Sequence, residues 1–240
     1  MRPFRTAWNG FPDVLLHADE IRVKQHPAYA TAKGGDADDA ASLIEHFVSA
    51  DAIERLACLV SGRSDVLLVS AHAYERSGVN AIPEALAEAA GLLLGLSVEH
   101  AIIQTNVVGH TGASGYARLA RPALFDGAVQ AGVSYVLVDD FIGQGGTLAN
   151  LRGFIEHRGG RVLGATVLTG KPYSATIALN HQTLSALRRK HDDDFEGWWQ
   201  ERFGYAFDRL TESEARYLVR SPDADTIRTR LAEEEQEGSG

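Results

Sequence analysis

The chain has 240 residues and a formal net charge of −9, and 45% of its residues are hydrophobic. This length and composition are typical of a folded domain with a substantial core, and they argue against an intrinsically disordered chain. The acidic balance, with no basic stripe, argues against a nucleic-acid duplex as the main partner.

The single cysteine, Cys58, excludes an internal disulfide framework and favours a reducing compartment. Because Cys58 falls within an apolar helical pattern, we expect a buried structural thiol. The N-terminus has no apolar signal core, and the longest apolar stretch, near residues 92–96, is too short to span a bilayer. The sequence therefore predicts a soluble, cytoplasmic protein with no membrane partner.

Residues 1–63 predict a helical addition before the core. Their first part, to about residue 25, has no clear period and is expected to run over the surface. Two helices follow, one from Asp36 and one capped by Ser49, because apolar residues recur there at helical spacing. Three residues just before these helices can face a ligand, although surface packing is the simpler interpretation: His26, Tyr29 and Lys33.

Residues 64–180 predict an α/β core. Strand-like apolar runs alternate there with helical patterns, which is typical of right-handed βαβ units and a parallel sheet. The runs fall at residues 65–69, 98–104, 135–138 and 161–168, with a further short candidate strand at 175–179. Ligands bind beyond the carboxyl ends of such strands. All four positions there are polar, which predicts a site along that edge: Ser70-Ala71-His72, Asn106 onward, Asp139 to Thr147, and Thr169 to Lys171.

Residues 181–240 predict a helical C-terminal addition that ends in an acidic tail. Thr211-x-x-Glu214 is a capping box and marks a helix start. The aromatic residues between Trp198 and Phe207 can stack on a base, but packing between helices is the favoured interpretation. The nine histidines form no metal-binding signature. We expect the three parts of the chain to pack as one unit.

Two acids and a glycine turn follow the third of the main strands. Residues 135–148 read YVLVDDFIGQGGTL: an apolar run, then Asp139 and Asp140, then a turn, then a helical pattern. A glycine turn at a helix N-terminus can aim backbone N–H groups at a phosphate. The carboxylates cannot bind that phosphate, but they can accept hydrogen bonds from the hydroxyls of a ribose. The inferred ligand is a phosphorylated sugar.

Two other phosphate-binding motifs do not match this turn. A dinucleotide fingerprint requires a third glycine where Leu148 stands. A P-loop requires Gly-Lys-Ser/Thr, and the turn contains no lysine. An ordinary βα turn of an α/β protein remains as the alternative interpretation.

Residues 136–147, VLVDDFIGQGGT, resemble the 5-phosphoribosyl-1-diphosphate (PRPP) binding motif of the type I phosphoribosyltransferases. Hydrophobic residues, two acids, a few variable positions and Gly-Gly-Thr match along the whole motif. The one departure is Gln144, where the family usually has Thr or Ser. The resemblance covers about residues 64–172 and implies the family's parallel-sheet, Rossmann-like fold.

The resemblance implies a role for each part of the predicted site. Asp139 and Asp140 would hold the ribose and stabilise its cationic transition state. The turn would grip the 5′-phosphate through Gly143, Gln144, Gly145, Gly146 and Thr147. Mg²⁺ would be held mainly by PRPP itself, with no direct protein ligand.

The pyrophosphate would be held by the turn after the first strand, Ser70, Ala71 and His72, with Arg76 as a further contact or simply a surface arginine. The loop from Asn106 to Tyr116, which carries His110, would close over PRPP. Arg118 at its edge would neutralise the departing pyrophosphate. Lys171 would contact the base, with a solvated lysine as the alternative.

The sequence therefore indicates a phosphoribosyltransferase that binds PRPP and Mg²⁺ and transfers the phosphoribosyl group to a nitrogen nucleophile, most simply a purine-like nucleobase. Pyrophosphate would be released, and the family implies a homodimer with a role in nucleotide metabolism such as purine salvage. Gln144 and a loop without an internal cation leave open a PRPP-sensing regulatory protein with the same fold and no transferase activity. A hydrolase or phosphorylase acting on a nucleotide is a weaker third possibility.

Overall fold

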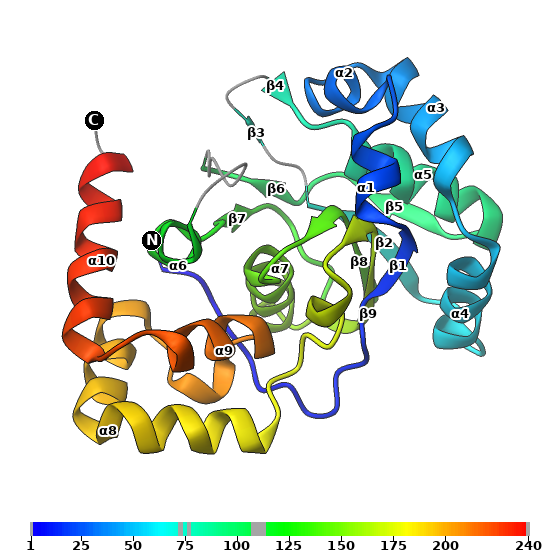
Figure 1. The fold of residues 1–240 in the computed structure, drawn as a ribbon. Coiled ribbons are helices and arrows are strands. Elements are labelled where there is room, and N and C mark those ends of the chain that lie inside the picture. The colour runs from blue at the N-terminus through cyan, green and yellow to red at the C-terminus, as the bar shows by residue number, and fades with distance from the viewer. Residues whose placement is uncertain (1, 72–73, 76–77, 107–113, 239–240) are drawn as a thin grey trace.

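Five parallel strands form the central sheet of the computed structural model (Figure 1). The structure describes residues 2–71, 74–75, 78–106 and 114–238. The strand order is β1-β9-β8-β2-β5, and each neighbouring pair is parallel. The bounds are β1 Leu15–Ala18, β2 Val66–Ser70, β5 Ser97–Glu99, β8 Ser134–Ile142 and β9 Arg161–Gly170. The predicted fold class, a parallel α/β core with helical additions at both ends, is confirmed.

Helices and two short antiparallel ribbons surround the sheet. The ribbons pair β3 Tyr74–Glu75 with β4 Gly78–Val79, and β6 Ile103–Gln104 with β7 Phe125–Asp126. The first helices are α1 Glu20–Lys24, α2 Tyr29–Lys33, α3 Ala37–Phe47, α4 Ala50–Val60, α5 Ile82–Leu94, α6 Gly115–Ala120 and α7 Gly146–His157. The later ones are α8 His181–Phe203, α9 Glu212–Arg220 and α10 Ala224–Gly238, with 3₁₀ turns η1 Pro172–Ser174 and η2 Phe207–Arg209.

The central strand β8 is buried on both faces, as its continuous apolar run predicts. Tyr135 and Leu137 point into the cluster formed with α7, whereas Val136 and Val138 point into the cluster formed with α3, α4 and α5. This alternation follows from the two-residue period of a strand. It fixes β8 between two helical layers, so that the acids at its carboxyl end occupy a defined position.

The C-terminal helices form a third hydrophobic cluster with α6, beside the sheet (Figure 1). Its buried side chains include Trp199, Phe203, Tyr205 and Phe207, and Trp198 packs against them partly buried, so the prediction that the aromatics of residues 198–207 pack between helices is confirmed. Helix α8 changes direction at Asp192, where φ is 54° and the carboxylate accepts a hydrogen bond from the Phe195 N–H at 3.0 Å. Among the described residues, none of the helices combines the length and apolar character that crossing a bilayer requires.

One prediction for the N-terminal segment is wrong. Residues 1–25 were expected to run over the surface, but Leu15–Ala18 forms strand β1 at the edge of the sheet beside β9. The strand has four residues, too few to show a period in the sequence. The segment therefore contributes to the sheet as well as to the helical layer.

Three further local predictions need correction. The expected strand at 98–104 is divided between β5 and β6, because the Glu99 carboxylate accepts the Ala101 N–H at 2.8 Å and turns the chain. The candidate strand at 175–179 gives only an isolated bridge between Ala178 and Thr211. Cys58 is exposed, since Leu56 lies on the buried face of α4 and Cys58 does not.

Candidate functional site

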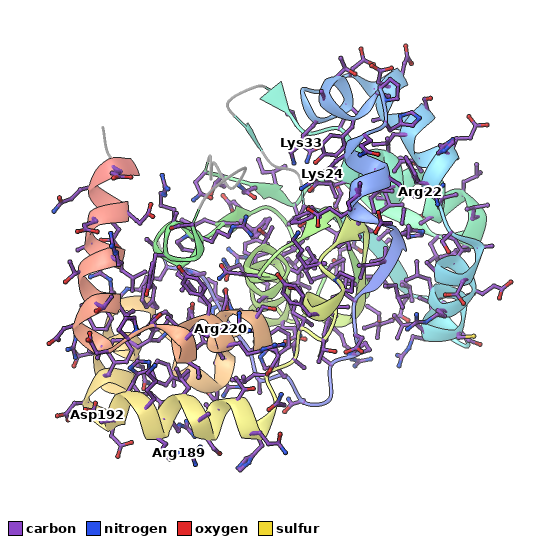
Figure 2. All side chains as sticks on the ribbon, in the orientation of Figure 1. Arg22, Lys24, Lys33, Arg189, Asp192 and Arg220 are labelled. Atoms are coloured by element: carbon purple, nitrogen blue, oxygen red, sulfur yellow. The ribbon has the colours of Figure 1, made fainter. Side chains whose placement is uncertain are left out.

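A cleft of about 920 Å³ lies at the carboxyl end of β8. Its walls come from the core and from both terminal additions. The N-terminal helices contribute Lys24 and Lys33, and the C-terminal helix α9 contributes Arg220. The two lysines lie well apart from Arg220 in Figure 2. Most of the predicted site residues that the structure describes line this cleft: Ala71, Arg118, Asp139, Asp140, Gly143, Gln144, Gly145, Gly146, Thr147 and Lys171.

The two acids are largely buried side by side, each with 8% exposure. The Asp140 N–H donates to Asp139 Oδ1 at 2.8 Å, and Lys33 Nζ lies 2.7 Å from Asp140 Oδ2. Burial and the neighbouring Asp140 raise the pKa of Asp139 well above its ordinary value. Burial also pushes the pKa of Asp140 upward, but the Lys33 ammonium outweighs it and leaves that pKa below its ordinary value. The pKa values of the two adjacent carboxyls are thus shifted in opposite directions.

Lys33 and Tyr29 both line the cleft. The preferred interpretation from the sequence, that these two residues pack on the surface away from a ligand, was therefore wrong. They are brought there by helix α2, which no motif connects to the acid pair. His26 instead packs its ring against His46 and Phe47. A lysine four residues after a tyrosine, on one face of a short helix, was the available signal, but it carries little information alone.

The glycine turn leads directly into the N-terminus of α7. Gly145 is the N-cap residue, in the left-handed conformation, and no side chain caps the helix. The first N–H groups of an α-helix have no partner within the helix. In α7 these donors, at Gly146, Thr147 and Leu148, begin a twelve-residue helix whose first turn lines the cleft. This arrangement is suited to an anion.

Contacts from the C-terminal addition hold the outer side of the turn. Thr211 Oγ1 donates to the Gln144 carbonyl at 2.6 Å, and Ser174 Oγ donates to the Gly143 carbonyl. The side-chain oxygen of Gln144 makes no hydrogen bond with any described residue. The carbonyls of Gly143 and Gln144 are therefore occupied by the fold, while the side-chain oxygen of Gln144 is buried without a partner among the described residues.

Replacing Gly145 with alanine is expected to lower the free energy of unfolding by about 1 to 2 kcal/mol. Its φ is +80°, and an added Cβ would stand 3.0 Å from Ile177 Cδ1. Urea unfolding followed by tryptophan fluorescence measures the change. Gly197→Ala is the matched control, because Gly197 lies in α8 with open space around it and should gain about 0.5 to 1 kcal/mol. Equal changes in the two variants would contradict the assigned strain.

A buried ion pair lies against the first residue of α7. The Arg5 guanidinium holds both Glu214 carboxylate oxygens at 2.9 Å, and each side chain is 3% exposed. Glu214 Oε1 stands 2.8 Å from the place where a Cβ on Gly146 would be. A side chain at residue 146 would therefore displace the Glu214 carboxylate. Arg5 neutralises Glu214, so the carboxylate adds no net charge beside the helix N-terminus.

The remaining predicted pyrophosphate residues lie in different places. Ala71 lines the cleft, but the buried Ser70 does not, and its hydroxyl donates to Glu84 at 2.6 Å. His72 and Arg76 lie outside the described residues. So does most of the predicted loop, 107–113, which includes His110.

Arg118 extends from α6 to the glycine turn, where its Nη1 lies 2.2 Å from the place of a Cβ on Gly143. Burial lowers the pKa of its guanidinium.

Lys171 also faces the cleft, but Glu20 Oε2 holds its Nζ at 2.7 Å, and the same carboxylate holds Lys24 Nζ at 2.6 Å. In the cleft, Lys24 and Lys171 thus share the Glu20 carboxylate as their partner.

Cationic side chains outnumber acidic ones in the cleft, although the chain as a whole carries a net charge of −9. The cationic side chains in its lining are Arg5, Lys24, Lys33, Arg118, Lys171, Arg216 and Arg220; the acidic ones are Glu20, Asp139, Asp140 and Glu214. A positive site in an acidic protein attracts anionic ligands.

A group of potential metal ligands lies apart from this cleft. Oxygen and nitrogen atoms of Glu84, Glu88 and His100 come within 4.8 Å of one another. His100 Nδ1 is 2.5 Å from Glu84, and its Nε2 is 3.4 Å from Glu88. The imidazole is therefore already placed to pair with both carboxylates.

Two curated proteins are similar in sequence. Protein TraN of Escherichia coli is 38% identical over 231 residues, which cover 96% of this chain and 51% of TraN. An uncharacterized protein of Haemophilus influenzae is 37% identical over 152 residues, which cover 63% of this chain and 34% of that protein. The chain therefore spans about half the length of TraN and less of the second relative. No protein-family model matches it.

Solved structures of adenine phosphoribosyltransferases are distantly similar. The enzyme from Thermoanaerobacter pseudethanolicus is 15% identical with a TM-score of 0.33, covering 56% of this chain and 84% of its own. The enzyme from Leishmania donovani is 12% identical with a TM-score of 0.35, covering 71% and 76%. At scores this low, the fold assignment rests on the strand order and pairing described above.

Proposed function

We propose that the cleft binds PRPP with Mg²⁺ and transfers its 5-phosphoribosyl group to a nitrogen nucleophile. One observation carries the proposal: the first turn of α7 is not capped by any side chain, and it follows, after the glycine turn, an acid pair near the end of β8. The first feature suits a phosphate and the second suits ribose hydroxyls. A single strand-turn-helix segment therefore offers both halves of a sugar phosphate site.

The two acids would act differently because their environments differ. Asp140, held anionic by Lys33, accepts from a ribose hydroxyl and stabilises positive charge at the anomeric carbon. Asp139, with its raised pKa, can donate as well as accept at the same edge. Two adjacent carboxyls with opposite pKa shifts thus serve a diol better than two identical anions would.

Magnesium would be compatible with this site when held chiefly by the ligand. The oxygen donors of the acid pair suit Mg²⁺, but Lys33 already neutralises Asp140. Asp139 and Asp140 would therefore bind the ribose hydroxyls and leave the ion to the oxygens of PRPP. Bound with PRPP, Mg²⁺ would supply charge neutralisation on the diphosphate.

In the transfer step, the bond between the anomeric carbon and the diphosphate oxygen breaks, and a bond from that carbon to the nucleophile's nitrogen forms. The electron pair of the broken bond leaves on pyrophosphate, and the proton of the nitrogen passes to solvent water. The Arg118 guanidinium beside the glycine turn would stabilise the leaving anion.

The volume of the cleft, about 920 Å³, is in the range for a substrate of drug-like size or larger.

A PRPP sensor without transferase activity is the second candidate. Gln144 favours it, because the side-chain amide replaces the hydroxyl usual at that position of the motif and has an oxygen with no partner among described residues. Such a protein would bind PRPP through the same acids and turn. Release of pyrophosphate in the presence of a nucleobase panel separates the two candidates.

Isothermal titration of PRPP with Mg²⁺ tests the site common to both. The wild type is expected to bind, and Asp139→Asn/Asp140→Asn to bind about tenfold or more weakly, since charge-assisted hydrogen bonds to the ribose are lost. Asp193→Asn/Asp194→Asn is the matched control, an adjacent acid pair that is exposed on α8. Undiminished binding in the Asp139/Asp140 double variant would reject the assigned roles.

A further inference from the structure

Helix α9 presents a cationic face to the cleft. Ser213, Arg216, Tyr217 and Arg220 all line it, at the spacing of one helical face. Arg216 and Arg220 are four residues apart, so their Cα atoms are separated by about 6 Å along the axis. Two guanidinium groups on neighbouring turns are placed to contact one anionic group or two adjacent ones.

These two arginines differ from the lysines on the opposite wall. Lys33 pairs with Asp140, and Lys24 and Lys171 share Glu20. Neither Arg216 nor Arg220 makes an ion pair or a side-chain hydrogen bond within the part of the chain that the structure describes. The positive charge of these two arginines is thus not balanced by an ion pair with any described residue, unlike that of the three lysines.

Acidic groups near α9 have other partners. Glu214 pairs with Arg5, and Glu212 accepts hydrogen bonds from the Asn180 N–H and the Thr183 hydroxyl. On α10, Glu234 accepts from Ser114 and pairs with Arg121. The neighbouring acids are therefore already engaged, and a ligand anion would not compete with them for the two arginines.

Helix α9 is fixed relative to the glycine turn. Its capping residue Thr211 donates to the Gln144 carbonyl, and Ser213 Oγ lies 3.0 Å from Ser174 Oγ, which binds the Gly143 carbonyl. Tyr217 packs against Gly115 so closely that an added Cβ there would come within 2.4 Å of the tyrosine ring. The arginines are consequently held one to two turns along a rigid helix that starts at the predicted phosphate site.

We propose that Arg216 and Arg220 bind an anionic group, a carboxylate or a phosphate, on the nitrogen nucleophile, so that the protein selects an acidic acceptor. This inference rests on the proposed function, because it assigns the acceptor for the same cleft. The phosphate of the sugar occupies the first turn of α7 and its diphosphate lies beside Arg118. The α9 pair then remains for the second substrate.

Matched acceptors that differ by one anionic group test the inference. The carboxylate pairs are orotate with uracil and anthranilate with aniline, and the phosphate pair is O-phosphoethanolamine with ethanolamine. Binding is measured by isothermal titration with and without PRPP and Mg²⁺, and turnover by pyrophosphate release. The wild type should favour an acidic member about tenfold or more, the size expected for charge-assisted hydrogen bonds.

Arg216→Gln/Arg220→Gln should reduce that preference to about twofold or less and leave the dissociation constant of PRPP within about twofold. Arg189→Gln, an exposed arginine on α8 away from the cleft, should behave as the wild type (Figure 2). Arg220→Gln alone, at an exposed position, should show part of the effect and guards against misfolding of the double variant.

Two results would overturn the inference. One is an unchanged preference in the double variant for every pair, and the other is a tenfold or larger loss of PRPP affinity, which would assign the arginines to the diphosphate. If the wild type binds no PRPP, the proposed function fails by itself. Comparing the binding of the acidic and the neutral member of each pair, without PRPP, then still decides whether the two arginines bind the acidic group.

Discussion

Replacing Glu214 with glutamine is expected to lower the free energy of unfolding by about 3 to 5 kcal/mol, because the buried Arg5 cation loses its counterion. Burial alone would lower the pKa of Arg5, and the Glu214 carboxylate reverses that shift and holds it above its ordinary value. Arg5 also donates to Asn150 Oδ1 at 2.5 Å and to the Arg209 carbonyl at 3.3 Å. It joins the N-terminal segment, helix α7 and the C-terminal addition.

Urea unfolding of the wild type and Glu214→Gln measures this loss. Glu233→Gln is the matched control, since the Arg230–Glu233 pair is 61% and 52% exposed and should contribute less than about 1 kcal/mol. Arg5→Met/Glu214→Gln should recover part of the loss, because no unpaired cation is left in the interior. If Glu214→Gln unfolds like Glu233→Gln, the pair does not join the three parts.

The acid pair and glycine turn could be predicted because they are contiguous. Strand β8 follows from a continuous apolar run and helix α7 from a helical pattern, and the turn between them has the glycines that its conformation needs. The capping box at Thr211 also predicted the start of α9 correctly, and both of its hydrogen bonds are present. Each of these features is encoded within about ten residues.

The rest of the cleft depends on pairs of residues that are distant in sequence. Lys33 and Asp140 are 107 residues apart, and Arg5 and Glu214 are 209 apart. No local period connects such pairs, since only tertiary packing brings α2 and α9 to opposite walls. The sequence therefore indicated Arg118 and Lys171 as cations of the cleft but not Arg5, Arg216 or Arg220.

The second large effect on stability is expected from replacing Lys33. Lys33→Met is expected to lower the free energy of unfolding at neutral pH by about 2 to 4 kcal/mol, since it leaves the Asp140 anion buried without its cation. The loss should be smaller than for Glu214, because the Lys33 side chain keeps 18% exposure and water can screen part of the charge. Asp139, only one residue away, makes the unpaired anion less favourable still.

The pH dependence of this loss follows from the directions of the two pKa shifts. In the wild type the pKa of Asp140 is lowered, so its contribution is present above the unfolded-state pKa and is lost as the pH falls through the folded-state pKa. The pKa of Asp139 is raised, so its contribution is present at low pH and is lost as the pH rises through the folded-state pKa. Without Lys33, the largest cause that lowers the pKa of Asp140 is removed, and burial shifts that pKa upward.

The difference in stability between Lys33→Met and the wild type should therefore be largest near about pH 8 and shrink toward about pH 4, where the unpaired Asp140 carboxyl of the variant becomes protonated. Urea unfolding across this range measures it. Lys24→Met is the matched control, a lysine on the neighbouring helix whose partner is Glu20 and whose side chain is 45% exposed; it should change stability by less than about 1 kcal/mol. Lys33→Met/Asp140→Asn should regain stability at neutral pH, since the unpaired charge is gone. A deficit of constant size at every pH would show that Lys33 acts through packing and not through the charge of Asp140.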